Sequence, residues 1–388
     1  MEKFDWVSTI SRNIRGLRVI GLWPESEEGY KMDLYTLYTA VCINSLMVIH
    51  VMCQVINIIA SHFDMDLIVE IFHILLQKIL GLIKMYVFMR NIKTLKQLLK
   101  NLNGDVFQPK NMEQRLLVKP TLRGWKLVFN VFFYPTMTTV LLCGLIPILN
   151  GSYKNYRLPF LAWYPFNTKR SPMYQIVFAH QMISFTFLAI TVVSIDMLTA
   201  ALLMYVGIQC DILCNNLRNL GYDNRDGIDF EKSLIACIEH HQNILDFSEK
   251  CNSLISFTVL VQFFISALTA ALALYQIAYF EIYSLQFCNG LMILGVSLIQ
   301  TTTYCWFGNE VEVKASSSGL ICYAAFQSNW TEQSPSAKKI LMIFMIRSLT
   351  PIKISSYNLF YLSLETHKKI LQSTWSYFTM LRQFGGVN

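Results

Sequence analysis

Long apolar stretches recur along the chain, and they constrain its fold more than any other feature. A helix needs roughly 20 apolar residues to cross the hydrocarbon core of a bilayer. Seven stretches reach that length, although charged residues interrupt the last one. We therefore predict an all-α membrane protein with seven transmembrane helices. The predicted spans are Leu34–Ala60, Leu67–Met89, Leu127–Leu149, Met173–Val206, Leu254–Tyr279, Tyr283–Phe307 and Ile354–Phe384.

The distribution of lysine and arginine predicts how these spans are oriented. The segment before the first span and the loops after the second, fourth and sixth spans hold 23 of these residues, whereas the loops on the other side hold four. Because cytoplasmic loops carry the excess of positive charge, we predict a cytoplasmic N-terminus and an extracellular C-terminus. A G-protein-coupled receptor has the opposite orientation. The chain also lacks the Asp-Arg-Tyr and Asn-Pro-x-x-Tyr motifs of that class.

Composition and missing motifs exclude several other classes. Only 15% of the residues are charged, against about 25% in an average soluble domain, so we expect no nucleic-acid partner. The chain has no glycine-rich phosphate loop, no His-Glu-x-x-His and no Gly-x-Ser-x-Gly, so we expect no enzyme activity.

Cys210 and Cys214 have no second pair to complete a metal site. His240 and His241 would point about 100° apart on a helix. We therefore expect no metal and no cofactor, and a packing or solvated role for the two histidines.

Two stretches outside the spans have helical character. Residues Ile228–Cys251 carry apolar side chains near helical spacing, and Ala337–Ile346 is apolar but too short to cross a membrane. Both lie on the predicted cytoplasmic side. We predict that they form helical extensions of the bundle below the membrane.

Ionisable residues inside spans are costly and therefore informative. Asp196 lies in the fourth span, and Lys78 and Lys84 lie in the second. For Asp196 the favoured interpretation is a polar contact between helices rather than a ligand contact. For the two lysines, snorkelling or a salt bridge between helices remains as plausible as a functional role.

The seventh span carries a polar stripe. As one helix of 31 residues it would be about 46 Å long. Lys369, Ser373, Ser376, Met380 and Gln383 follow one another at steps of four and three residues, which places them on one helix face. Such a face must contact protein or water rather than lipid. Two interpretations remain open, an ordinary buried helix contact and the wall of a water-filled path closed by an apolar ring at Met380.

The C-terminal third resembles the insect odorant receptor family, and the seven-span pattern extends the resemblance to the whole chain. The end of the chain is also similar to the Thr-Tyr-(five residues)-Gln-Phe signature of the sister gustatory receptors, with Ser376 in place of threonine. The segment Ala324–Trp330 and the chain length favour the odorant branch. The residues that carry the resemblance are Tyr304-Cys-Trp-Phe-Gly308, Ala324-Ala-Phe-Gln-Ser-Asn-Trp330, Pro351, Leu362-Ser363, Ser376-Tyr377-Phe378 and Leu381.

The resemblance implies a ligand-gated channel. Family members form tetrameric, odorant-gated, non-selective cation channels in which a ligand-tuned subunit assembles with a shared olfactory co-receptor. The expected localisation is the plasma membrane of olfactory sensory neurons. The expected division of the chain is 1–306 for the ligand-binding bundle, 307–353 for a cytoplasmic anchor and 354–388 for the pore helix and C-terminus. The expected pore and gate residues are Met380, Gln383, Phe384, Tyr377 and Ser373.

The resemblance also implies a pocket for a small volatile molecule in the outer half of the bundle, among the second, third, fourth and sixth spans. An apolar and aromatic lining suits such a ligand. The alternatives are a gustatory receptor channel that works without the co-receptor and, ranked below it, a G-protein-coupled receptor or a transporter. The pocket residues expected from their depth in the spans are His73, Leu76, Gln77, Phe133, Tyr134, Met137, Leu141, Phe185, Leu188, Val192, Asn289, Met292 and Val296.

Overall fold

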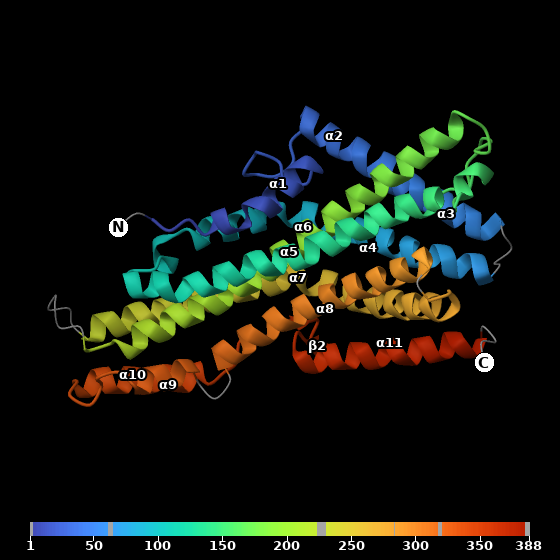
Figure 1. Ribbon diagram of the computed structural model, residues 1–388. Helices are drawn as coiled ribbons and strands as arrows, with labels where there is room; N and C mark the ends of the chain where they lie inside the picture. The colour runs from blue at the N-terminus through green and yellow to red at the C-terminus, as the bar shows by residue number, and fades with distance from the viewer. Residues whose placement is uncertain (1–2, 61–64, 223–229, 283, 317–319, 385–388) are drawn as a thin grey trace.

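The computed structural model describes residues 3–60, 65–222, 230–282, 284–316 and 320–384, apart from the side chains of residues 65–70, 316 and 384. Long helices run along one axis, and the first and last described residues lie at opposite ends of the bundle (Figure 1). The elements are η1 (Val7–Ile10), α1 (Ser11–Val19), α2 (Leu34–Cys42), the π-helix η2 (Ile43–Val48), α3 (Ile49–Ala60), α4 (Met65–Leu102), η3 (Asp105–Phe107), α5 (Met112–Leu149), η4 (Ser152–Asn155), α6 (Met173–Arg218), α7 (Phe230–Tyr279), α8 (Leu285–Ser316), α9 (Leu320–Phe326), α10 (Pro335–Ser348), β1 (Ser355–Ser356), β2 (Phe360–Tyr361) and α11 (Leu364–Phe384).

The predicted all-α membrane architecture is confirmed. In the described part of the chain, six helical segments are long and apolar enough to cross a membrane. The first is the continuous series α2–η2–α3, and the others contain α4, α5, α6, α7 and α8. Several helices extend well past the predicted spans. For example, α4 continues to Leu102, α5 begins at Met112 and α7 begins at Phe230.

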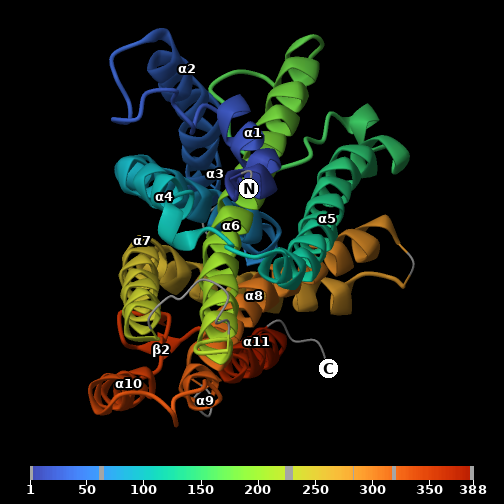
Figure 2. The same ribbon diagram turned by 90° about the vertical axis from the view of Figure 1, so that its left-hand side faces the viewer.

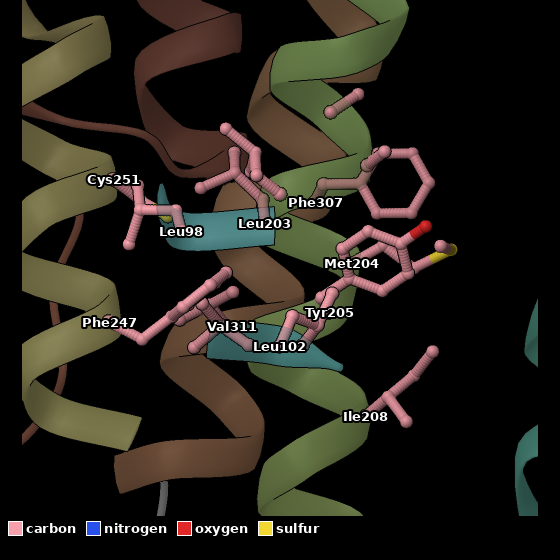
Figure 3. Packing of buried hydrophobic residues seen from close by; sticks show 14 of the residues in the cluster. Leu98, Leu102, Leu203, Met204, Tyr205, Ile208, Phe247, Cys251, Phe307 and Val311 are labelled. Carbon is pink, nitrogen blue, oxygen red and sulfur yellow. The ribbon is translucent and has the colours of Figure 1, made fainter. Parts of the chain in front are cut away.

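Helix α6 is the centre of the bundle. In Figure 2, which looks along the bundle, α6 lies between α4 and α7 on one side and α5 on the other. The most apolar window of α6 is 94% buried, as expected for a helix that is apolar on all sides. Figure 3 shows how Leu203, Tyr205 and Ile208 of α6 pack with side chains of α4, α7 and α8.

The helical extensions at one end of the bundle agree with the sequence. Helix α7 begins at Phe230 and runs without a break into the fifth span; the first two residues of the predicted stretch Ile228–Cys251 lie outside the described residues. The apolar stretch Ala337–Ile346 forms most of α10. Helices α9 and α10 lie together at the end that the extended helices reach (Figure 1, lower left). Because α8 continues to Ser316, the expected division after residue 306 falls inside a helix.

The prediction of one helix over Ile354–Phe384 is wrong. Residues Ser355–Ser356 and Phe360–Tyr361 form an antiparallel hairpin, and α11 begins only at Leu364. The turn contains Tyr357 and Asn358 with positive φ angles of 48° and 58°, which a helix cannot accommodate. Helix α11 therefore has 21 residues and a length of about 32 Å, which still matches the hydrocarbon core.

Hydrogen bonds to α7 hold this hairpin in place. Ser355 N donates to Asn252 Oδ1 at 2.9 Å, and Ser356 Oγ donates to the carbonyl of Ser256 at 2.7 Å. On the other side the hairpin is close to α8, since a Cβ atom at Gly308 would lie 2.3 Å from Leu362 Cβ. The hairpin thus links α7 and α8 directly to the start of α11.

Candidate ligand pocket and pore helix

A cavity of about 390 Å³ lies at the end of the bundle that carries the α5–α6 and α7–α8 connections (Figure 1, right). Its volume falls within the range of about 300–1,000 Å³ that is common for small-molecule sites. Helices α4, α5, α7 and α8 and the segment 157–160 form its walls. The lining residues are His73, Ile74, Cys143, Ile146, Pro147, Asn150, Ser152, Arg157, Leu158, Pro159, Phe160, Tyr275, Gln276, Tyr279, Phe280, Gln286 and Asn289.

Hydrogen bonds fix the loop segment that forms one wall. Phe160 N donates to Gln181 Oε1 at 3.1 Å, and Gln181 Nε2 donates back to the Phe160 carbonyl at 2.8 Å. Tyr174 Oη donates to the carbonyl of Arg157 at 3.0 Å. Because Gln181 and Tyr174 belong to α6, this wall is attached to the central helix. A ligand that displaces Phe160 would therefore act on α6.

Phe160 links the cavity wall to buried residues of the bundle. It packs with Ile74 and Cys143, and its ring lies 4.9 Å from that of Phe185 and 6.2 Å from that of His50. The polar groups of the lining stand among these apolar side chains. Asn289 Oδ1 accepts a long hydrogen bond of 3.6 Å from Cys143 Sγ. The cavity thus combines aromatic contact area with many hydrogen-bonding side chains, among them His73, Gln276 and Asn289.

The structure brings two of the thirteen expected pocket residues, His73 and Asn289, into the cavity wall. Phe185 contacts the wall through Phe160. Tyr134 and Leu141 are 62% and 63% exposed on the outside of α5, and Gln77 Nε2 donates to Thr269 Oγ1. Ligand contact by these residues stays a prediction. Leu188 and Val192 are buried in the central core, Phe133 and Val296 pack against it, and Leu76, Met137 and Met292 are half-buried.

Sequence reasoning missed the loop that forms part of the pocket. Many of the residues selected by their depth in the spans, such as Met137 and Val296, lie one or more turns below the lining residues of the same helix, because the cavity lies close to the helix ends. The sequence did contain a signal that this loop contacts the bundle. Leu158–Trp163 is an apolar run between Arg157 and Lys169, in a segment predicted to face water. Such a run in an outer loop indicates a segment that folds back onto the protein.

The buried ionisable residues Lys84 and Asp196 form a salt bridge between helices, which confirms the favoured interpretation of Asp196. Lys84 Nζ of α4 lies 2.5 Å from Asp196 Oδ1 of α6. Tyr304 Oη of α8 donates to the same oxygen at 2.8 Å, and Gln300 Nε2 donates to Asp196 Oδ2. Gln300 also donates to Gln262 Oε1 of α7 at 3.2 Å. One carboxylate therefore joins α4, α6 and α8, and α7 follows through Gln300.

The two adjacent histidines have packing roles. His240 is buried, with Nε2 3.0 Å from Gln209 Oε1, and His241 packs edge-on against Phe344. The described residues contain no group of three or more His, Cys, Asp or Glu side chains that could hold a metal ion.

Helix α11 packs against α7 and α8 with one face and leaves the other open. Met380 is 55% exposed, and Lys369, Ser376 and Gln383 are also exposed. Ser373 and Tyr377 line a groove of about 500 Å³ between α11, the hairpin and α7. The side chain of Phe384 lies outside the described residues. Lys369 pairs with Glu365 and Ser376 Oγ donates to the carbonyl of Gln372, both within α11, so much of the polar stripe stays exposed in a single chain.

Comparisons with known proteins agree with this architecture. A family model described as "7tm Odorant receptor" matches residues 64–375. Odorant receptor 23a of Drosophila melanogaster is 25% identical over 262 residues, which is 66% of each chain. Odorant receptor 46a, isoform A, of the same fly is 21% identical over 95% of each chain.

The fold has a solved counterpart. The insect olfactory receptor OR5 from Machilis hrabei, in complex with eugenol, superposes with a TM-score of 0.85 at 19% identity. The superposition covers 98% of this chain and 100% of that one. These similarities favour the odorant branch over the gustatory one and over a G-protein-coupled receptor.

Proposed function

The chain belongs to the 7tm odorant receptor family, and we propose that it is the odorant-tuning subunit of a heterotetrameric, non-selective cation channel. Its partner in the channel is an olfactory co-receptor. The family consists of receptors and not enzymes. The subunit lies in the plasma membrane of olfactory sensory neurons with a cytoplasmic N-terminus and an extracellular C-terminus, binds a small volatile molecule and opens the pore in response.

The observation that carries this proposal is the pairing of a preformed cavity with an open helix face. The cavity of about 390 Å³ is lined by four membrane helices and the 157–160 segment, and the similar receptor from Machilis hrabei was solved in complex with eugenol. The exposed stripe of α11 supplies the wall of a pore when several subunits surround an axis. Each feature alone has simpler explanations, but a ligand-gated channel needs both.

A continuous set of contacts supports coupling between the two sites. The cavity is lined by α7 and α8, and further along the same helices Phe263 packs edge-on against Tyr304. Phe263 also stacks on Phe360 of the hairpin at 5.3 Å, and Leu362 touches Gly308 of α8. A ligand that binds the open arrangement of α7 and α8 more tightly shifts the hairpin and α11 with them.

The direct test is whole-cell current in cells that express this chain with and without an insect co-receptor, during perfusion of a panel of volatiles. The proposal requires rapid cation current that depends on both the ligand and the co-receptor. Current without the co-receptor would assign the chain to a self-sufficient channel instead. Absence of current in the presence of both subunits at the cell surface, over a broad panel, would contradict the proposal.

The variant Asn289→Leu is expected to weaken responses to oxygenated ligands. Asn289 is one of the hydrogen-bonding groups in the cavity wall, and a lost hydrogen bond costs about 0.5–1.5 kcal/mol, or up to roughly tenfold in half-maximal concentration. Dose–response curves for a ketone and for the hydrocarbon of the same size measure the effect. Only the ketone response should shift. The control is Leu291→Ala, since Leu291 is exposed on the same helix. Equal responses of Asn289→Leu and the parent receptor to every oxygenated ligand would remove Asn289 from the site.

A further inference from the structure

Lys78 is a fully buried lysine without an ion-pair partner. Its relative exposure is 0%, and among the described residues no carboxylate lies within ion-pair distance of its ammonium group. Lys84, two turns along the same helix, has Asp196 for this purpose. Burying an unpaired charge is costly unless another group compensates it. The described part of the chain therefore supplies no negative charge to compensate Lys78.

Around Lys78, two buried donors, His50 Nε2 and Gln54 Nε2, have no acceptor among the described residues. Lys78 Nζ contacts His50 Nδ1 and donates to Ser184 Oγ at 2.7 Å. Because the ammonium donates to Nδ1, the neutral imidazole carries its proton on Nε2. His50 Nε2 is buried and has no hydrogen-bond partner in the described part of the chain. The same is true of both side-chain amide atoms of Gln54, one turn further along α3.

Nearby backbone carbonyls do not fill this role. Two carbonyls of the π-helix η2 face α6, and both already have partners there. The Ser45 carbonyl lies 2.9 Å from His180 Nε2, and the Leu46 carbonyl accepts a hydrogen bond from Ser184 Oγ. The serine hydroxyl thus donates to the backbone and accepts from Lys78. The His50 N–H and the Gln54 amide N–H groups remain without an acceptor. A bound water could satisfy such donors, but it would leave the lysine charge uncompensated.

The unpaired groups lie directly behind the ligand cavity. Ile74, which lines the cavity, and Lys78 are four residues apart on α4, which is about 6 Å along the helix. Phe160 contacts both regions, because it lines the cavity and its ring lies 6.2 Å from that of His50. An extended ligand that moves the Phe160 ring aside would reach Lys78 with its end group while its chain stays in the cavity.

We propose that Lys78, His50 and Gln54 form a subsite for the carboxylate of a short-chain organic acid, whose hydrocarbon chain occupies the outer cavity. The carboxylate supplies the missing charge to the ammonium and accepts hydrogen bonds from the imidazole and the amide. The inference rests on the proposed function, since it names the ligand class of the same receptor. One carboxylate would meet the ammonium of Lys78 and the two unpaired donors His50 Nε2 and Gln54 Nε2.

The test compares hexanoate, hexan-1-ol and methyl hexanoate, which share a chain and differ in charge. On the receptor co-expressed with the co-receptor, Lys78→Met is expected to raise the half-maximal concentration of hexanoate about tenfold or more, because a hydrogen bond to a charged group is lost. The half-maximal concentrations of the alcohol and the ester should change by no more than about twofold. That change is smaller than the effect of losing one hydrogen bond between neutral groups. His50→Phe and Gln54→Leu should each shift the acid response in the same direction.

Surface expression separates a folding defect from a binding defect in this variant. Removing the buried charge relieves its desolvation cost, whereas the contacts with His50 and Ser184 are lost, so the currents of Lys78→Met and the parent are compared at matched surface levels. The matched control is Lys93→Met, since Lys93 is exposed on the same helix. Equal shifts for acid, alcohol and ester, or no shift for the acid, would overturn the inference.

A binding measurement separates this inference from the proposed function. Purified receptor in lipid nanodiscs is titrated with labelled hexanoate, before and after Lys78→Met. Saturable binding that the substitution abolishes, without any current, would support the subsite and contradict the channel role. Current evoked by neutral volatiles without any hexanoate binding would overturn the subsite and leave the proposed function intact.

Discussion

Replacing Asp196 with asparagine is expected to remove most of the folded receptor from the cell surface. The substitution keeps the shape of the side chain but deletes the charge that faces Lys84 in a fully buried pair. Breaking a buried ion pair on one side costs about 3–5 kcal/mol because the other charge stays buried and uncompensated. Total stabilities of about 5–15 kcal/mol leave little margin for such a loss. Surface labelling and detergent-solubilised melting curves measure the effect.

Removing both charges should reverse much of this loss. The double variant Lys84→Met/Asp196→Asn leaves neither charge of this pair uncompensated, so its surface level should recover most of the way to that of the parent. Lys93→Met serves as an unaffected control on the same helix. The coupling energy from the four receptors of the cycle then measures the pair itself. Normal surface levels of Asp196→Asn alone would show that the carboxylate does not hold α4, α6 and α8 together.

Replacing Met380 with alanine is expected to produce a channel that leaks without ligand. Met380 is 55% exposed on the open face of α11, where it can meet its counterparts around an axis. Truncation removes Cγ, Sδ and Cε, which at about 0.8 kcal/mol per buried CH₂ group amounts to about 2 kcal/mol of closed-state contact. That energy corresponds to at least about a tenfold rise in the open fraction. Basal current before and after a pore blocker measures it.

The control for this prediction is Trp375→Ala. Trp375 is 61% exposed on the same helix, but five residues place it about 140° away from Met380. Its truncation should leave basal current unchanged. If both variants leaked equally, the cause would be a loosened helix rather than a gate. If Met380→Ala left leak, conductance and gating unchanged, the ring of Met380 side chains would not close the pore.

The long helices could be predicted because a single physical requirement determines them. A segment such as Met173–Val206 is apolar on every side, and only burial in a bilayer or in a bundle satisfies such a helix. The same reasoning identified Asp196 as an inter-helix contact, because an intramembrane carboxylate must be paired. It could not choose between Lys78 and Lys84 as the partner. That choice depends on which lysine faces α6 at the depth of Asp196, which is a property of helix packing.

The hairpin before α11 and the exact position of the pocket could not be predicted from the sequence. Residues 354–363 are apolar enough to continue a helix. The hairpin is stabilised by hydrogen bonds to Asn252 and Ser256 of α7, at least 100 residues earlier, and by the stacking of Phe360 on Phe263. Phe160 likewise reaches the cavity because Gln181 binds its backbone on both sides. Such contacts between distant segments leave no periodic trace along the chain.

The most direct test of the central claim, that α11 lines an odorant-gated pore, is covalent modification at position 380. Met380→Cys is co-expressed with the co-receptor, and a positively charged thiol reagent is applied with and without an activating volatile; Trp375→Cys serves as the matched site on another helix face. Rapid loss of current at position 380 in the presence of ligand, with little effect at position 375, is the expected result. Equal modification rates at both positions, or modification of Met380→Cys that leaves the current intact, would show that α11 does not line the pore.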